Sequence, residues 1–361
     1  MHLQNLPAVM NLTSPYQRIE MTSEIFHFDS NLNLESGEEL SGFDIAFTIY
    51  GDIHNTSLPV IWINHALTGN AYVTEWWSGL VGEDKFYDPN DYRIISSNLL
   101  GSCYGSSNPL STNPETQEPY YYDFPTLTTR DQAKALELLR QHLDVKQIHT
   151  LIGGSLGGQV ALEWSYTLGN KLKNSIIIAS NAKSTPWIIG FNEAQRMAIS
   201  ADCTWGEHHP EAGKDGIKTA RAIGMLTYRH PQAFIETQKE QEEKLDNFKV
   251  SSYLRYQGEK LSQRFNALSY WVLTKAMDSH DLGRGRGGLE KALGEISAKV
   301  LAIGIDTDEL FRKEESQLIS NFSTKGVYAE IKSPYGHDAF LIEYEQLKYI
   351  LKSFYLSNNE S

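Results

Sequence analysis

The chain has 361 residues and a formal net charge of −13 at pH 7, with 40% apolar and 21% charged residues. This length and composition are ordinary for a globular enzyme that buries its core without disulfides or metal ions. The negative charge argues against a general role on nucleic acids or anionic membranes, which would repel the chain, although one anionic substrate can still bind in a local basic pocket.

Short apolar runs alternate with helical patterns along the first half of the chain. Four runs predict buried strands: 58–63, 92–97, 148–152 and 175–179. Residues 129–142 predict a helix, with Thr129 and Asp131 as capping candidates. The pattern returns near the C-terminus, with a strand at 298–305, a helix at 314–322, a strand at 327–331 and a helix at 346–355. This order predicts an α/β fold with a mostly parallel sheet covered by helices on both faces.

The composition changes between residues 183 and 295. Glutamate, glutamine, lysine and arginine dominate there, and helical spacing recurs, as at 217–228 and 264–277. We interpret 183–295 as a helical lid inserted into a core domain that comprises residues 1–182 and 296–361.

The two cysteines, Cys103 and Cys203, belong to no motif with the spacing of a zinc or thiol-redox site. We therefore expect no bound metal and a reducing, cytoplasmic setting. The N-terminal residues lack the basic start and long apolar run of a signal peptide. Because no stretch approaches the roughly 20 apolar residues that span a bilayer, we expect no membrane partner.

The sharpest motif surrounds Ser155, in the run Gly153 to Gly158 (GGSLGG). It follows the strand 148–152 and precedes a helical segment, which is the context of a G-x-S-x-G nucleophile elbow. The helix N-terminus that follows would place the amide of Leu156 where it can stabilise an oxyanion. A glycine-rich turn with an idle serine is the alternative. A Rossmann phosphate loop is disfavoured because its glycines follow the first strand of the fold.

A serine hydroxyl needs a base to take its proton. In folds with a nucleophile elbow, the chain order is serine, acid, histidine. His337, just after the strand 327–331, is the last histidine of the chain and the candidate base. The acid should follow the strand 298–305, where Asp306, Asp308 and Glu309 all qualify. Position alone does not choose between them, and alternation along an extended segment would aim the side chains of Asp306 and Asp308 the same way.

An oxyanion hole needs a second amide, usually from the loop after an early strand. The loop Asn64 to Gly69 follows the strand 58–63 and fits this description. His65 precedes the nucleophile in the chain, so we interpret it as a residue that stabilises this loop and not as the base.

Further motifs extend along nearly the whole chain, in this order: His65–Gly69, Trp76–Leu80, Asn98–Ser106, Asn113–Thr116, Asp123–Pro125, Thr129–Asp131, Gly153–Trp164, Asn192–Arg196, Leu226–Arg229, Tyr256–Lys260, Ala276–Asp278 and Gly336–Leu341. In this combination the sequence resembles the homoserine O-acetyltransferase family of methionine biosynthesis, whose members have the α/β-hydrolase fold with a helical lid. The resemblance therefore implies this fold and an acyltransferase activity.

By position, the resemblance implies Ser155 as nucleophile, His337 as base and Asp308 as acid, with Asp306 as the second choice. It also implies that Arg221 and Asp338 bind the substrate. These two residues suit an amino acid, because an arginine can pair with its carboxylate and a carboxylate with its ammonium group.

The implied reaction has two steps and no permanently bound cofactor. Ser155 attacks the thioester of acetyl-CoA, and the oxyanion rests on the amides of Leu67 and Leu156. L-Homoserine then takes the acetyl group through its γ-hydroxyl, with His337 as base. A lid that excludes water would protect the acyl-serine from hydrolysis. The resemblance also implies a homodimer.

Several residues depart from the family pattern: Leu156 and Gln159 where methionines are common, Ser102 for a glycine, and Asn266 for an aspartate. These departures leave a succinyl donor or a serine acceptor open, and an esterase or thioesterase is a further alternative. Arg284 and Arg286, in a glycine-rich stretch, either contact CoA phosphates or belong to a solvated loop.

Overall fold

The computed structural model describes residues 21–52 and 55–357. The N-terminal residues on which the signal-peptide expectation depends lie outside these described ranges.

One sheet of eight strands forms the centre of the molecule, in the order β1-β2-β4-β3-β5-β6-β7-β8. The strands are β1 (Met21–Asn33), β2 (Glu39–Tyr50), β3 (Val60–Asn64), β4 (Arg93–Ser97), β5 (Ile148–Gly154), β6 (Leu172–Ile178), β7 (Lys299–Ile305) and β8 (Gly326–Ile331). Strands β3 to β8 are parallel, whereas β2 pairs antiparallel with β1 and with β4. The prediction of a mostly parallel sheet is therefore confirmed.

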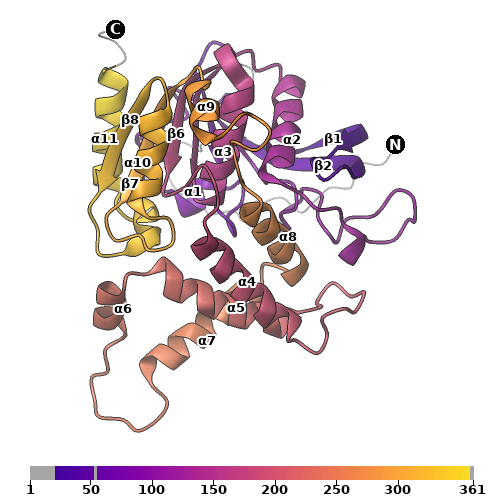
Figure 1. Cartoon of the computed structure of the whole chain (residues 1–361), viewed down its shortest axis with the longest axis vertical. Coiled ribbons are helices and arrows are strands. Elements are labelled where there is room, and N and C mark those ends of the chain that lie inside the picture. Colours follow the sequence, from indigo (N-terminus) through magenta and orange to yellow (C-terminus); the bar gives the residue numbers. More distant parts are fainter. Residues whose placement is uncertain (1–20, 53–54, 358–361) are drawn as a thin grey trace, which may run out of the picture.

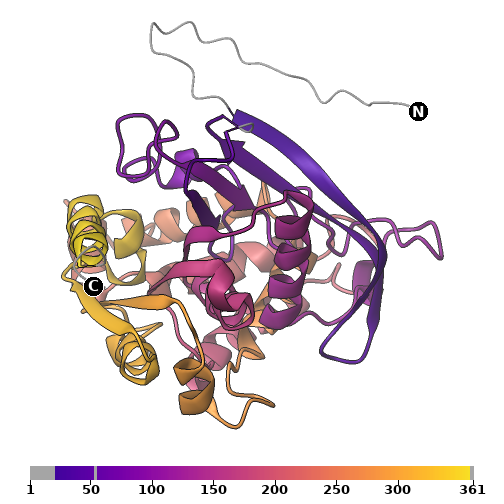
Figure 2. The same cartoon turned by 90° about the horizontal axis from the view of Figure 1, so that it is seen from above.

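The antiparallel pair β1–β2 was not predicted from the sequence. Strand β1 lies at the edge of the sheet, and most of its side chains are exposed and polar, so it lacks a continuous apolar run. Its partner β2 does alternate, with Phe43, Ile45 and Phe47 buried. Figure 2 shows this long pair at one edge of the sheet, far from the C-terminal helix.

Helices cover both faces of the sheet, as predicted. Two hydrophobic cores result, one with side chains from α2 (Thr129–His142), α3 (Leu156–Leu168) and α10 (Lys313–Phe322), and one with side chains from α1 (Val73–Trp76) and α11 (Tyr344–Leu356). Alternation along β3 explains the division, because Trp62 belongs to the first core and its neighbours Ile61 and Ile63 to the second. Helix α2 begins with a capping box of Thr128 and Asp131, so Asp131 caps as predicted but Thr129 does not.

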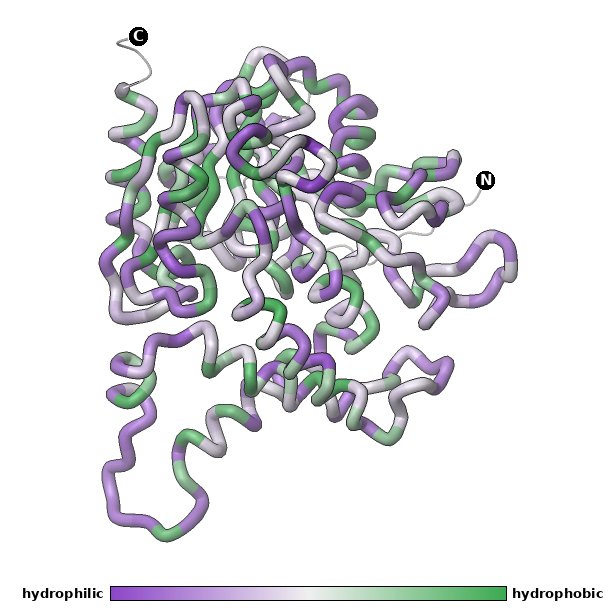
Figure 3. The backbone as a smooth tube through the Cα atoms, viewed as in Figure 1, coloured by the Kyte–Doolittle hydropathy of each residue, from purple (hydrophilic) through white to green (hydrophobic). Residues whose placement is uncertain are grey.

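Six helices lie between β6 and β7, and the first five of them extend beyond one end of the sheet (Figure 1). These five are α4 (Pro186–Ser200), α5 (Lys214–Tyr228), α6 (Pro231–Gln238), α7 (Lys249–Ser262) and α8 (Ala267–Asp278). We call α4 to α8 and their connections the inserted helices. The short helix α9 (Leu289–Gly294) packs against α10. Figure 3 shows that the connection between α6 and α7 is largely hydrophilic.

Three short 3-10 helices complete the described elements: η1 (Tyr121–Asp123), η2 (Gly169–Lys171) and η3 (Gly336–Leu341). Within the described ranges, no helix combines the length and apolar character that a membrane span requires. Cys103 and Cys203 are both free thiols.

Candidate active site

Ser155 occupies the sharp turn between β5 and α3. Its backbone has φ 56° and ψ −127°, a conformation that L-residues rarely adopt and that indicates local strain. Three hydrogen bonds hold the turn: the Ser155 amide donates to the carbonyl of Ile178 at 3.0 Å, the Gly158 amide donates to the carbonyl of Ser155, and the Ser180 hydroxyl donates to the same carbonyl. The neighbouring strand therefore holds the turn in its strained conformation.

Two glycines of the turn allow the backbone to pack more closely than any side chain would permit. A Cβ atom at Gly153 would lie 2.2 Å from the carbonyl oxygen of Gly157, and one at Gly157 would lie 2.4 Å from that of Asn64. The start of α3 is thereby in contact with the loop that follows β3. This contact explains why both positions require glycine.

The two predicted oxyanion donors lie on these neighbouring segments. Leu156 is the first residue of α3, where backbone amides have no partner within the helix. Leu67 lies in the turn closed by the Gly69 amide, which donates to the carbonyl of Ala66 at 2.8 Å. Among the described residues, no hydrogen-bond acceptor faces either amide. Both amides are thus available to a charged oxygen.

His337 and Asp308 form a buried pair at the carboxyl ends of β8 and β7. Nδ1 of His337 lies 2.6 Å from Oδ2 of Asp308, and both side chains are at most 5% exposed. The amides of Leu310 and Phe311 donate to the other oxygen of Asp308, so the carboxylate is fixed. Burial alone would lower the pKa of His337, but the charge and hydrogen bond of Asp308 outweigh it and raise that pKa above 6.5.

Aromatic rings enclose this pair. Phe311 stacks on His337, and the rings of Tyr228 and Phe340 lie 5.8 and 5.6 Å from it. Phe340 also contacts the turn of Ser155, since a Cβ atom at Gly154 would lie 2.7 Å from its ring. The structure therefore brings His337 next to this turn, although no hydrogen bond links the Ser155 hydroxyl to any described residue. Such bonds often form only when substrate binds.

Asp306, the second choice for the acid, points elsewhere. Its Oδ1 accepts a hydrogen bond from the amide of Ser333 at 2.9 Å and so fixes the loop after β8. The two aspartates were expected to point the same way, because side chains alternate along an extended strand. That expectation was wrong, because β7 ends at Ile305 and the chain turns before Asp308.

His65 is fully buried and stabilises its loop through two hydrogen bonds. Its Nδ1 lies 2.8 Å from the carbonyl oxygen of Ala66, and its Nε2 accepts from the amide of Leu99. These two bonds require a neutral ring with the proton on Nδ1. Burial lowers the pKa of His65 to about 4, so the ring stays neutral near pH 7.

The predicted substrate-binding residues Arg221 and Asp338 lie on either side of Tyr228 and His337. The guanidinium of Arg221 is 5.5 Å from the ring of Tyr228, and Asp338 directly follows His337. Asp338 is paired with Arg229, whose Nε lies 2.8 Å from its Oδ2. Burial raises the pKa of Asp338, and Arg229, His337 and Arg221 partly offset this effect.

Sequence reasoning assigned no role to Arg229. Arg229 belongs to the motif Leu226–Arg229, but no local pattern shows that this residue at the end of α5 contacts Asp338. Only the packing of the Tyr228–His230 segment against Gly336 brings the two together.

Arg284 and Arg286 are both paired within the protein. Arg284 donates to both oxygens of Glu35, at 2.9 and 2.8 Å. Arg286 pairs with the buried Glu163 at 2.7 Å and stacks over the ring of Tyr166. These pairs join the loop before α9 to the core, although the side chain of Arg284 is still 41% exposed. The CoA-phosphate interpretation stays a prediction. Within the described part of the chain, no cluster of three or more histidine, cysteine or acidic side chains is placed to hold a metal ion.

Comparison with known proteins gives a family match and a close relative. A family model described as the α/β hydrolase fold matches residues 59–344. A homoserine O-acetyltransferase from Cyclobacterium marinum is 64% identical over 350 residues, which make up 97% of this chain and 100% of that protein.

Two solved structures share the fold. A homoserine O-acetyltransferase from Bacillus anthracis has a TM-score of 0.84 at 21% identity and covers 92% of this chain and 96% of its own. An acetylester hydrolase from Corynebacterium glutamicum has a TM-score of 0.80 at 23% identity, with 92% and 95% covered. These likenesses confirm the predicted fold. Because one protein is named as a transferase and the other as a hydrolase, the fold alone does not distinguish the two reactions.

Proposed function

We propose that this chain, which belongs to the homoserine O-acetyltransferase family of the α/β hydrolase fold, transfers an acetyl group from acetyl-CoA to the γ-hydroxyl of L-homoserine in methionine biosynthesis. One structural observation supports the chemistry above all others. The buried pair of His337 and Asp308 adjoins the strained turn of Ser155, which is the arrangement that activates a serine nucleophile.

In the first step, the Ser155 hydroxyl attacks the thioester carbonyl and its proton passes to Nε2 of His337. Asp308 holds Nδ1 of the ring and stabilises the imidazolium that forms. The amides of Leu67 and Leu156 donate hydrogen bonds to the developing oxyanion. The carbon–sulfur bond then breaks, and CoA leaves as a thiol with the proton from His337.

In the second step, L-homoserine attacks the acyl-serine. His337 takes the proton of the γ-hydroxyl, the new ester bond forms, and Ser155 leaves with the proton returned. Arg221 pairs with the carboxylate of the substrate. Asp338 accepts hydrogen bonds from the ammonium group of the substrate, which takes the place of the Arg229 guanidinium. Neither step uses a permanently bound cofactor or a metal ion.

We assign residues 1–182 and 296–361 to a core domain and 183–295 to a lid that keeps water from the acyl-serine.

We also propose a cytoplasmic homodimer. The large apolar side chains exposed on the inserted helices, Met197, Leu226, Ile235 and Tyr256, support an association through this region. The two free thiols suit a reducing compartment.

The test is CoA release by the purified protein from acetyl-CoA or succinyl-CoA, each with L-homoserine, L-serine or no acceptor. We expect homoserine-dependent release from acetyl-CoA that is lost in Ser155→Ala. Release at the same rate without an acceptor would instead identify a thioesterase. A preference for succinyl-CoA or serine would preserve the mechanism but change the substrates, and full activity of Ser155→Ala would contradict the assigned nucleophile.

A further inference from the structure

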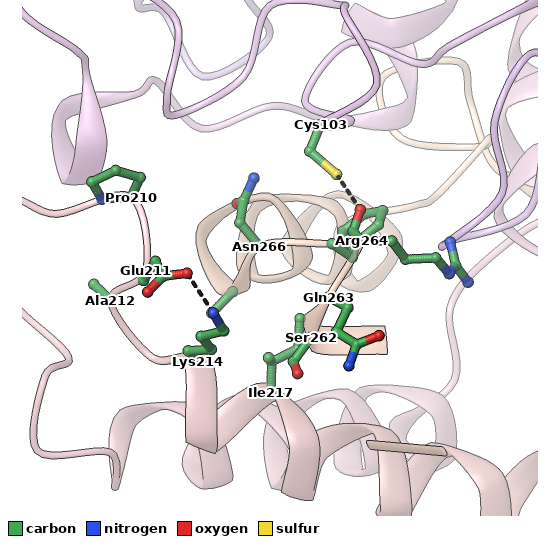
Figure 4. Close-up of a pocket in the computed structure, with 12 residues that line it drawn as sticks. Cys103, Pro210, Glu211, Ala212, Lys214, Ile217, Ser262, Gln263, Arg264 and Asn266 are labelled. Carbon is green, nitrogen blue, oxygen red and sulfur yellow. Dashed lines mark hydrogen bonds and ion pairs between the residues drawn. The ribbon is translucent and has the colours of Figure 1, made fainter. Parts of the chain in front are cut away.

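Arg264, in the connection between α7 and α8, reaches across to the turn that carries Leu67. Its Nη1 donates to the carbonyl of Thr68 at 2.8 Å and also to the hydroxyl of Tyr104. The same connection meets the core a second time, where Sγ of Cys103 lies 3.8 Å from the carbonyl oxygen of Arg264 (Figure 4). The inserted helices are thus tied to the core beside the proposed oxyanion hole.

The orientation of the Leu67 amide depends on how its turn is held. The carbonyl of Ala66 accepts from the Gly69 amide and from the ring of His65, both at 2.8 Å. Because the peptide unit is planar and trans, fixing this carbonyl also fixes the Leu67 N–H on its opposite side. Arg264 fixes the carbonyl of Thr68, whose peptide unit carries the Gly69 N–H that donates to the carbonyl of Ala66. The core therefore holds one side of the turn and the inserted helices hold the other.

A cavity of about 320 Å³ lies beside this connection, lined by residues of the inserted helices, among them Lys214, Ser262 and Arg264, and by Cys103 of the core. Of all described residues of the inserted helices, Arg264 alone is hydrogen-bonded to the segment 64–69. An arginine suits this contact, since its guanidinium is always charged and offers several donors in a fixed plane.

We propose that Arg264 is a positioning residue that couples the seating of the inserted helices to the geometry of the oxyanion hole. When the inserted helices are packed on the core as in this structure, the guanidinium of Arg264 donates to the Thr68 carbonyl. This bond keeps the Leu67 amide directed at the reacting carbonyl. When the helices shift, this bond is lost and the hole loosens. The inference rests on the proposed function, in which the Leu67 amide is an oxyanion donor.

The experiment compares Arg264→Met with Arg264→Lys and with Arg255→Met, a matched change at an exposed arginine of α7. The probe is a neutral p-nitrophenyl alkylphosphonate. Ser155 Oγ bonds to phosphorus, p-nitrophenolate leaves with the bonding electrons, and the serine proton passes to His337. The phosphoryl oxygen gains negative charge in the oxyanion hole, so nitrophenolate release reports on the hole without CoA or homoserine.

We expect Arg264→Met to slow both phosphonylation and acetyl transfer about tenfold to a hundredfold, because a donor displaced by a fraction of an ångström loses much of its effect. The KM for L-homoserine and the unfolding temperature should stay close to those of the unchanged protein. Arg264→Lys should restore part of the rate, since an ammonium group can still donate to Thr68. Arg255→Met should react normally.

Phosphonylation of Arg264→Met at the normal rate would overturn the inference. So would a parallel loss of phosphonylation, homoserine binding and unfolding temperature, which would indicate a purely structural contact. Failure of the proposed function gives a different result: the unchanged protein would then release CoA from acetyl-CoA without needing L-homoserine, or the phosphonate would label a residue other than Ser155, as identified by mass spectrometry.

Discussion

The turn that carries Ser155 and the inserted helices that face it are held by different kinds of contact. The turn is packed backbone against backbone, with Gly157 against Asn64 and the Ser155 amide bonded to β6. The inserted helices meet the core around the site through the packing of residues 228–230 against Gly336 and also through polar side-chain contacts, Arg229 with Asp338 and Arg264 with Thr68. A backbone contact cannot be exchanged for a substrate group, whereas an ion pair can.

This difference fits the two tasks of the site. A nucleophile and its oxyanion donors must be held within about half an ångström of the productive geometry. A pocket that admits and releases substrates must instead open and close, and polar contacts between half-buried side chains are weak enough to be exchanged. The comparison predicts that substitutions around Ser155 in the core act mainly on the rate. Substitutions in the inserted helices, apart from Arg264 with its bond to the turn, should act mainly on local stability.

The largest effect is expected in the core, for Asp308→Asn. An amide cannot stabilise the imidazolium of His337, so kcat for acetyl transfer should fall about 10⁴-fold with little change in unfolding temperature. Asp306→Asn is the matched control, because Asp306 bonds the Ser333 amide and does not reach His337. Steady-state kinetics of both variants check the prediction. An equal loss in Asp306→Asn would contradict it.

The inserted helices depend on a buried arginine. Arg196 on α4 is 1% exposed and pairs with Asp278 at the end of α8. Arg196→Met leaves Asp278 without its cation and should lower the free energy of unfolding of these helices by about 3–5 kcal/mol. Hydrogen exchange of α4 and α8 measures this change.

The control is Glu193→Gln, which removes the exposed partner of Arg196 and should cost less than about 1 kcal/mol. If exchange in the core strands increased as much as exchange in α4 and α8, the two regions would unfold together and the comparison would fail.

The pH dependence of the acylation rate should reflect the pKa of His337 in the core and not the inserted helices. The neutral form of His337 is the base, so the rate should fall about tenfold per pH unit below its pKa, and the midpoint should lie above pH 6.5. The contribution to stability has the opposite sign: a raised pKa stabilises the fold below about pH 6.5, and this contribution is lost as pH rises through the folded value. The initial burst of CoA release without acceptor, followed against pH, is the measurement. A midpoint below 6.5 would be inconsistent with the Asp308 pair.

The smallest effect concerns a glycine of the inserted helices. A Cβ atom at Gly190 on α4 would meet no atom within 4 Å, in contrast to the blocked position at Gly157. Gly190→Ala should therefore stabilise the helix by about 0.5–1 kcal/mol through its higher helix propensity, without changing kcat. Thermal unfolding measures this gain, and a loss of stability would show that α4 is as closely packed as the turn.

Local sequence patterns predicted much of the core. The apolar runs at 148–152 and 298–305 lie within β5 and β7, and the glycines around Ser155 predicted a sharp strand-to-helix turn. These features can be read locally because an apolar run or a glycine constrains its own few residues, whatever the rest of the chain does. Strand β1 was missed for the same reason, since its polar residues at the sheet edge lack such a run.

Sequence patterns alone predicted the parallel strands, the sharp turn of Ser155 and the position of His337 after the last strand. Local patterns left Asp306 and Asp308 open, the resemblance implied Asp308, and the structure shows Asp308 paired with His337. The contacts of Arg229 with Asp338 and of Arg264 with the turn of Leu67 became evident only from the folded chain. These partners are separated by 29, 109 and 196 residues in the chain. Their meeting depends on the packing of whole helices and strands, and no local pattern specifies such a contact.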